Sequence, residues 1–129
     1  MNQRNYQKEL DALIECNTRE GKTPTLLLHS CCAPCSSYVL EYLSQFFHIT
    51  IYFYNPNITF GEEYERRMEE QQRLISQLPA KNPIKFLQGK YEPDRFYQLA
   101  KGLEKAPEGG ERCFKCYELR LITLQLYYP

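Results

Sequence analysis

Residues 25–36 read TLLLHSCCAPCS, and this stretch decides the expected fold. Its first five residues form a short, unbroken apolar run, which is typical of a strand buried in a parallel sheet. Three thiols follow, together with Pro34 and two serines, which are the usual signals of a loop that leads into a helix. The stretch therefore predicts a parallel strand with cysteines just past its carboxyl end.

The segments around this strand continue an alternating pattern. Apolar spacing predicts helices over residues 6–18, 38–46, 62–78, 93–103 and 113–127, a loop over 30–36, and further strands over 48–54 and 84–87. Such alternation predicts an α/β fold, with a small parallel sheet and helices on both faces in a three-layer α/β/α core. Ligands of these sheets bind beyond the carboxyl ends of the strands, where the cysteines are expected.

Size and charge limit the class of protein. The chain has 129 residues, which predicts a single domain over 1–129, and its formal net charge is +0. Without a basic excess, a nucleic-acid partner has to be met by a local basic face. No apolar leader or membrane-length apolar run is present, so we expect a cytoplasmic protein that does not enter a membrane.

Five of the six cysteines fall into two clusters. The first contains Cys31, Cys32 and Cys35, and the second contains Cys113 and Cys116. Both clusters are expected at helix starts, where unpaired N–H groups and the helix dipole favour the thiolate form. In a reducing compartment, clustered thiols of this kind indicate a metal centre or redox chemistry rather than structural cross-links.

Three kinds of site remain open from the residues alone. Zinc held by two Cys-x-x-Cys pairs uses four thiols and leaves Cys31 without a role, as in a zinc-stabilised nucleic-acid- or protein-binding module without catalysis. A [4Fe–4S] cluster also takes four thiolates, and its ligands can be distant in sequence. A dithiol oxidoreductase needs only Cys32 and Cys35. We expect the isolated Cys16 to be a packing residue.

Three separated blocks resemble the epoxyqueuosine reductase QueH family. They are HSCCAPCS at 29–36, YNPNI at 54–58 and ERCFKCYELRL at 111–121, in the order found in that family. The resemblance implies a HUP-like α/β core and an oxidoreductase with a [4Fe–4S] cluster. Its ligands would be the adjacent pair Cys31 and Cys32 together with Cys113 and Cys116. It also implies an additional iron ion beside the cluster, where Cys35 is placed to assist.

The same resemblance implies a partner and divides the chain. The family reduces epoxyqueuosine to queuosine at the wobble position of tRNA, the last step in making that base, with electrons from an external donor. On this pattern, residues 1–24 are an N-terminal helix and linker, 25–121 are the QueH-like core, and 122–129 are a divergent end. The apolar end of the chain predicts a truncated or frame-shifted member, whose own activity is in doubt because the family continues further.

Other polar residues near the cysteines are weaker candidates. Asn55 and Asn57 follow the second strand and are candidates for substrate binding, although Asn-Pro-Asn is also a common turn. His29 is a candidate proton donor, or simply a packed histidine at a strand end. Arg112 and Lys115 lie among the second cysteines, where they could meet phosphate. A candidate tRNA face comprises these two residues with Arg66, Arg67, Arg73 and Arg120, although the three on the charged helix favour a solvated surface.

Overall fold

The computed structural model describes residues 3–127, and its elements alternate as the sequence predicts. They are α1 (Tyr6–Arg19), β1 (Thr25–His29), α2 (Ala33–Leu43), β2 (His48–Phe53), α3 (Gly61–Gln77), β3 (Lys85–Gln88), α4 (Pro93–Ala100) and α5 (Glu111–Tyr127). Residues 1, 2, 128 and 129, which belong to the predicted domain over 1–129, lie outside the described residues. None of the helices in the described part of the chain is long and apolar enough to span a bilayer.

The three strands form one parallel sheet in the order β1-β2-β3. Thr25 lies opposite His48 between the first two strands, and Thr50 lies opposite Lys85 between the second and third. All three carboxyl ends therefore point to the same edge. This arrangement confirms the predicted α/β class with a small parallel sheet, whereas the HUP-like assignment stays a prediction.

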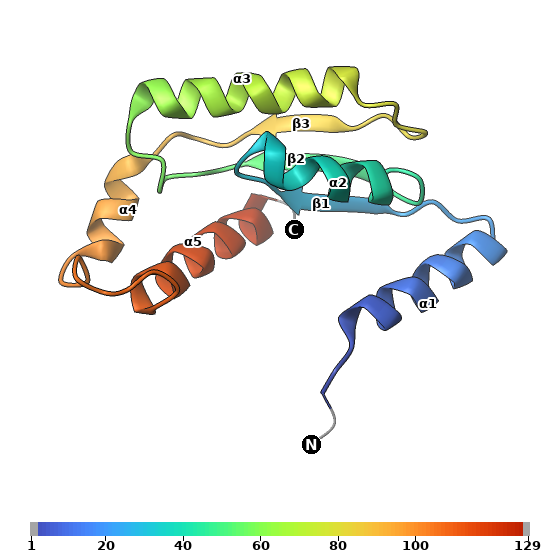
Figure 1. Ribbon diagram of the computed structural model, residues 1–129, viewed down its shortest axis with the longest axis horizontal. Coiled ribbons are helices and arrows are strands. Elements are labelled where there is room, and N and C mark those ends of the chain that lie inside the picture. Colours follow the sequence, from blue (N-terminus) through green and yellow to red (C-terminus); the bar gives the residue numbers. More distant parts are fainter. Residues whose placement is uncertain (1–2, 128–129) are drawn as a thin grey trace.

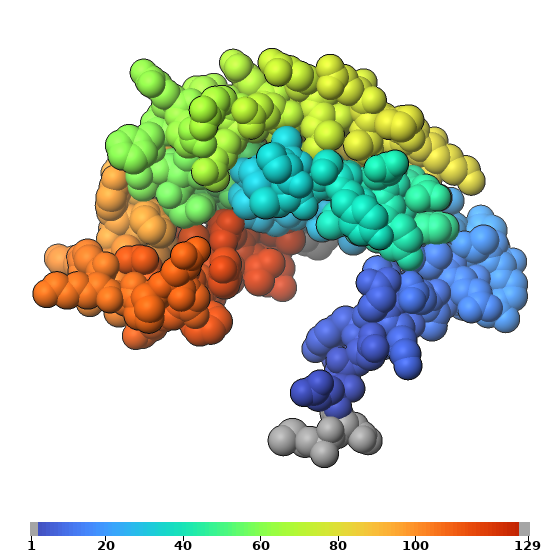
Figure 2. All heavy atoms as spheres, in the orientation of Figure 1, coloured from blue at the N-terminus to red at the C-terminus, as the bar shows by residue number. Residues whose placement is uncertain are grey.

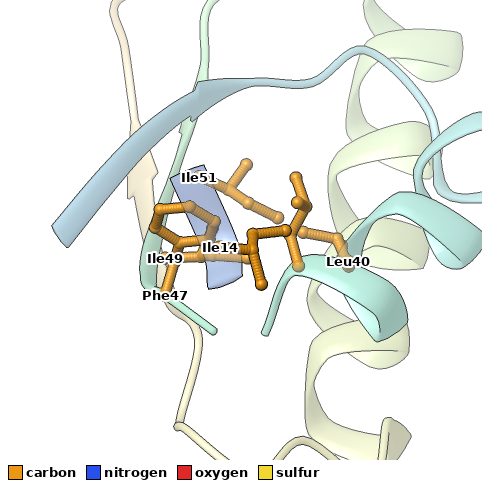
Figure 3. Close-up of a cluster of buried hydrophobic side chains, with 6 residues drawn as sticks. Ile14, Leu40, Phe47, Ile49 and Ile51 are labelled. Atoms are coloured by element: carbon orange, nitrogen blue, oxygen red, sulfur yellow. The ribbon is translucent and has the colours of Figure 1, made fainter. Parts of the chain in front are cut away.

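The main core fills the space between the sheet and the first two helices. Ile14 of α1 and Leu40 of α2 meet Ile49 and Ile51 of β2, as Figure 3 shows. Because side chains alternate along a strand, Ile49, Ile51 and Phe53 all point to this face. The apolar stripe of α3 packs beside them, so that α1, α2 and α3 cover one face of the sheet.

Helices α4 and α5 lie on the other face, near the carboxyl end of the strands (Figure 1). Tyr54 follows β2 on that face, and its hydroxyl donates to Glu92 Oε1 at 3.2 Å, just before α4. Thr123 of α5 interacts with the same hydroxyl, and α5 also contacts β1. Helices on both faces are thus confirmed, but the second face is only partly covered.

The amino-terminal ends of the strands are left accessible. They line a hollow of about 600 Å³, at the opposite edge of the sheet from the cysteines. Figure 2 shows a wide gap in the outline between α1 and α5. Helices α4 and α5 therefore cover the second face of the sheet only at the end that lies beside the cysteines.

Two helix starts differ from the sequence prediction. The loop expected over 30–36 ends earlier, because α2 already begins at Ala33 with Pro34 in its first turn, where the fixed φ of proline favours a helix. Helix α5 begins at Glu111, two residues before the expected position. Cys35 therefore lies inside the first turn of its helix instead of before it, and Cys113 is the third residue of its helix instead of the first. Helix α4 ends at Ala100, before Gly102, whose φ of +85° leaves the helical region.

Candidate functional site

The loop that carries the first cysteines is fastened to the end of β2. The His29 Nε2–H donates to the Tyr54 carbonyl at 2.7 Å, since a carbonyl oxygen can only accept. Asn55 Nδ2 donates to the Ser30 carbonyl at 3.0 Å. Asn55 is 1% exposed, and its Oδ1 has no donor among the described residues. These two bonds hold the ends of the neighbouring strands in register just before Cys31.

A buried glutamine supports the same loop from the other side. Gln71 of α3 is fully buried and accepts from Ser30 Oγ at 3.0 Å, while its Nε2 donates to Ser36 Oγ at 3.1 Å. Ser36 Oγ also donates to the Cys32 carbonyl at 2.9 Å. The loop is therefore bound on one side to β2 and on the other to α3, so that its backbone is fixed independently of any ligand.

The three thiols of the first cluster have unlike electrostatic surroundings. Burial and the neighbouring Cys32 raise the pKa of Cys31, against the opposing charges of Arg120 and Arg67. Burial would also raise the pKa of Cys32, but hydrogen bonds from the side chain and backbone of Cys35 outweigh it and lower that pKa. The Cys35 thiol is exposed, and its bond to Cys32 raises its own pKa. Cys32 is thus the preferred thiolate of this cluster.

The second cluster lies in the first turns of α5. The Gly109 amide donates to Cys113 Sγ at 3.3 Å, which helps to hold that sulfur at the helix start. Cys116 is 5% exposed, and burial raises its pKa, while the nearby Arg120 opposes this shift. One sulfur of the pair is therefore partly accessible and the other is enclosed.

Arg120 acts electrostatically on both cysteine clusters. Its charge acts on Cys116 of its own helix and on Cys31 across the site. The pKa of His29 is lowered, first because the ring is buried. The hydrogen bond to the Tyr54 carbonyl opposes this shift, and the charge of Arg120 adds to it. Within residues 3–127, no three cysteine, histidine or carboxylate side chains lie close enough together to bind one metal ion. The charged side chain of Arg120 thus acts on both clusters, but their thiols do not form a complete set of metal ligands.

A cleft of about 350 Å³ brings together several of the predicted residues. Asn57, Arg112, Cys113 and Cys116 line it together with Arg120. Asn57 Oδ1 is buried and has no hydrogen-bond donor among the described residues. The cleft therefore offers two guanidinium groups and two thiols to a ligand that enters between α5 and the segment after β2, while the Asn57 oxygen beside it is closed off from solvent.

Other predicted residues lie elsewhere. Lys115 lines a separate hollow with Arg95, on a different side of α5. Arg66 and Arg67 both pair with Glu63 on α3, the second of them at 2.7 Å. Arg67 nevertheless acts electrostatically on Cys31, Cys32 and Cys35. The roles proposed for these cations in tRNA binding stay predictions.

Two residues of the site were missed at the level of sequence. Gln71 continues the stripe Tyr64, Met68, Gln71, Ile75 at alternating spacings of four and three, so its burial could have been predicted from the helical period. Phe96 of α4 lines the cleft, and no local pattern distinguishes it from an ordinary amphipathic residue. Only the packing of α4 beside α5 places it there.

Comparison with known proteins shows one family. The family model described as epoxyqueuosine reductase QueH matches residues 26–127, past the predicted limit of the core at Leu121. The epoxyqueuosine reductase QueH of Staphylococcus epidermidis is 46% identical over 121 residues, which are 91% of this chain and 51% of that protein. Its namesake in Streptococcus pyogenes serotype M1 is 43% identical over 119 residues, or 91% and 47%. The chain thus spans about half the length of these relatives. No solved structure matches.

Proposed function

Because the chain belongs to the epoxyqueuosine reductase QueH family, we propose that it is an oxidoreductase that converts epoxyqueuosine to queuosine in tRNA. The observation that carries the proposal is the family match over residues 26–127, which includes both cysteine clusters. Removal of the epoxide oxygen as water, leaving an alkene, takes two electrons and two protons. An external donor has to supply the electrons.

The proposed cofactor is a [4Fe–4S] cluster held by Cys31, Cys32, Cys113 and Cys116. Four thiolates are the usual ligands of such a cluster, and the chain offers these four with Cys35 beside them for an additional iron ion. A bound cluster supplies electrons one at a time. Because no three of the described thiols meet at one point, the proposal requires α5 and the loop after β1 to approach each other when the cluster binds.

The protein's own residues account for three parts of the proposed reaction. Arg120 places positive charge between the clusters and thereby favours thiolates in both. Asn57 and Arg112 line the adjacent cleft and can hold a substrate there. His29 keeps its Nε2 proton on the Tyr54 carbonyl, so we assign it to fixing the end of β1 instead of supplying a proton.

Anaerobic reconstitution with iron and sulfide tests the cofactor, and an assay with epoxyqueuosine-containing tRNA tests the reaction. We expect broad visible absorption that is lost in Cys31→Ser, Cys32→Ser, Cys113→Ser and Cys116→Ser. Cys16→Ser is the matched control and should keep the absorption, because Cys16 lies on α1. A colourless protein that binds stoichiometric zinc would instead support the non-catalytic zinc module. Absence of queuosine with a fully loaded chain would contradict the proposed reaction.

A second candidate function has one observation in its favour. Cys32 lies at the N-cap of α2, and its pKa is lowered by hydrogen bonds from Cys35, as expected for the attacking thiolate of a dithiol oxidoreductase. In that reaction the two thiols would form a disulfide as a substrate disulfide is reduced to two thiols. Metal-free protein that reduces a disulfide substrate, with loss of activity in Cys35→Ser, would favour this function.

A further inference from the structure

Strand β1 forms an edge of the sheet and has outward-facing backbone groups. Within the described residues, its only partner strand is β2. The Pro24 carbonyl, directly before β1, accepts from the His48 N–H at 2.9 Å and therefore faces β2. Because the backbone groups of successive strand residues point to opposite sides, the N–H and C=O groups of Thr25, Leu27 and His29 face away from β2. Such a row of groups can pair with a further strand.

One face of the sheet is uncovered next to this edge. Leu27, Thr50 and Lys85 are aligned across the three strands, and they line the hollow of about 600 Å³. These residues alternate with those of the main core and so belong to the opposite face of the sheet. None of the described helices contributes to the lining of the hollow. Because parallel sheets normally have both faces covered, this part of the sheet surface is suited to a further packing element.

The carboxyl-terminal half of α5 exposes apolar side chains near the same edge. Leu121, Ile122 and Leu126 are 56%, 45% and 79% exposed. Leu121 and Leu126 lie about 140° apart around the helix, so more than one side of it is apolar, and helices of that kind are normally buried. Helix α5 contacts β1, and its carboxyl-terminal end lies beside that strand (Figure 1). The exposed leucines therefore adjoin the unpaired edge.

The connections between the strands indicate what the edge is for. Helix α2 joins β1 to β2 and α3 joins β2 to β3, and both pack on the face of the main core. Doubly wound sheets bind their ligands where the connections of neighbouring strands pass over opposite faces. No pair of the three described strands meets this condition. A further strand on the free edge of β1, connected over the other face, would place the loop with Cys31 at such a crevice.

We propose that the edge of β1, the uncovered sheet face and the exposed leucines of α5 form one docking surface for a second α/β polypeptide. About half of each compared relative has no counterpart in this chain, and a polypeptide of that kind is the proposed occupant. It adds a parallel strand to β1 and packs a helix against Leu27 and α5. A second copy of this chain fits less well, because two-fold symmetry pairs the two β1 edges antiparallel and separates their cysteine loops. The inference goes beyond the proposed function and needs family membership alone.

Co-expression of the full chain with the part of the Staphylococcus epidermidis relative that has no counterpart in it tests the surface. We expect a 1:1 complex in size-exclusion chromatography with light scattering, and sedimentation over a dilution series gives its dissociation constant. Leu126→Lys should weaken the complex by at least about 10-fold, because the partner buries this leucine. The urea midpoint of the free chain should not fall, since Leu126 is exposed and a cation is favourable at the end of a helix. Leu13→Lys, at an exposed position of α1, is the matched control and should change neither.

Hydrogen exchange and proline substitution test the edge itself. In the free chain, the outward-facing amide of Leu27 should exchange faster than that of Leu28, which faces β2. In the complex, exchange at Leu27 should slow by at least about 10-fold. Leu27→Pro removes an N–H that β2 does not use, so the free chain should stay folded while the complex is lost. Leu28→Pro removes a bond to β2 and should lower the urea midpoint of the free chain.

Several outcomes would overturn the inference. One is a chain that stays monomeric in the presence of the co-expressed polypeptide, and another is a Leu27 amide that is already protected in the free chain. Self-association that protects Leu27 would assign the surface to a second copy and overturn the proposed occupant. Complex formation without epoxyqueuosine reduction would contradict the proposed function alone. Reduction by a chain that forms no complex would overturn this inference alone.

Discussion

Replacing Gln71 by leucine tests whether the buried amide fixes the cysteine loop. Gln71 is fully buried on α3, while Ser30 and Ser36, its two partners, are 6% and 7% exposed. Leucine has a similar volume but cannot accept from Ser30 Oγ, which lies 3.0 Å from the amide oxygen, or donate to Ser36 Oγ at 3.1 Å. The substitution therefore leaves the buried Ser30 hydroxyl without its hydrogen-bond acceptor. Ser36 loses its bond from Gln71 but keeps its bond to the Cys32 carbonyl.

These losses can be estimated separately. A stranded buried hydroxyl costs about 1–3 kcal/mol, and the lost bond to Ser36 about 0.5–1.5 kcal/mol. The additional apolar surface of a buried leucine offsets about 1 kcal/mol of this. We therefore expect Gln71→Leu to lower the free energy of unfolding by about 2 kcal/mol. In urea, this corresponds to a midpoint that falls by roughly 1 M.

Urea unfolding followed by circular dichroism measures the effect. Gln72→Leu is the matched control, because Gln72 is the next residue of the same helix and is exposed; its effect should stay within about 0.5 kcal/mol. Adding Ser30→Ala to Gln71→Leu removes the stranded hydroxyl and should restore part of the loss. The reasoning is refuted by a Gln71→Leu midpoint equal to that of Gln72→Leu, or by a double variant that is no more stable than Gln71→Leu.

Three further substitutions should lower the urea midpoint, each for a different reason. Leu40→Ala removes a fully buried side chain from the main core and should cost about 2–5 kcal/mol; a loss below 1 kcal/mol would contradict the assigned core. Gly89→Ala places a Cβ 2.8 Å from Tyr52 Oη and 3.1 Å from Tyr54 Cβ, and should cost about 1–3 kcal/mol, whereas unchanged stability would show that this approach is not tight. Asn55→Ala leaves the buried Ser30 carbonyl without its donor at 3.0 Å and should cost about 1–3 kcal/mol; Asn55→Asp, which cannot donate there, should not restore it.

The sequence predicts those parts of the fold that depend on local periodicity. The apolar run of residues 25–29 coincides with β1, and the order of helices and strands agrees throughout. These elements were predictable because burial imposes a period on neighbouring residues. The start of α2 was misjudged because the serines and cysteines of residues 30–36 resemble a loop, while Pro34 favours the first turn of a helix as strongly as it favours a turn.

The site was predictable only as a set of residue types. Two cysteine clusters at helix starts follow from spacing, and the parallel sheet explains why the first lies at a carboxyl edge. The partners of these residues do not follow from spacing. Ser30 and Gln71 are 41 positions apart, and the cleft residues Asn57 and Arg112 are also far apart in the chain. Such pairs are created by tertiary packing, which no local pattern in a single sequence records.

The two cysteine clusters differ in how firmly the fold holds them, and this difference indicates which one moves when four thiols share a cofactor. The first is fixed by the bond that Asn55 donates to the Ser30 carbonyl, by the bond that Gln71 accepts from the Ser30 hydroxyl and by the bond that Gln71 donates to Ser36 Oγ. By contrast, Arg112 at the start of α5 donates to the carbonyls of Leu103 and Glu104, which belong to the adjoining loop. Since moving the first loop breaks several buried bonds and moving the start of α5 breaks few, we expect α5 to approach the edge of the sheet. Arg120, whose charge already acts on sulfurs of both clusters, would then lie beside the assembled ligands.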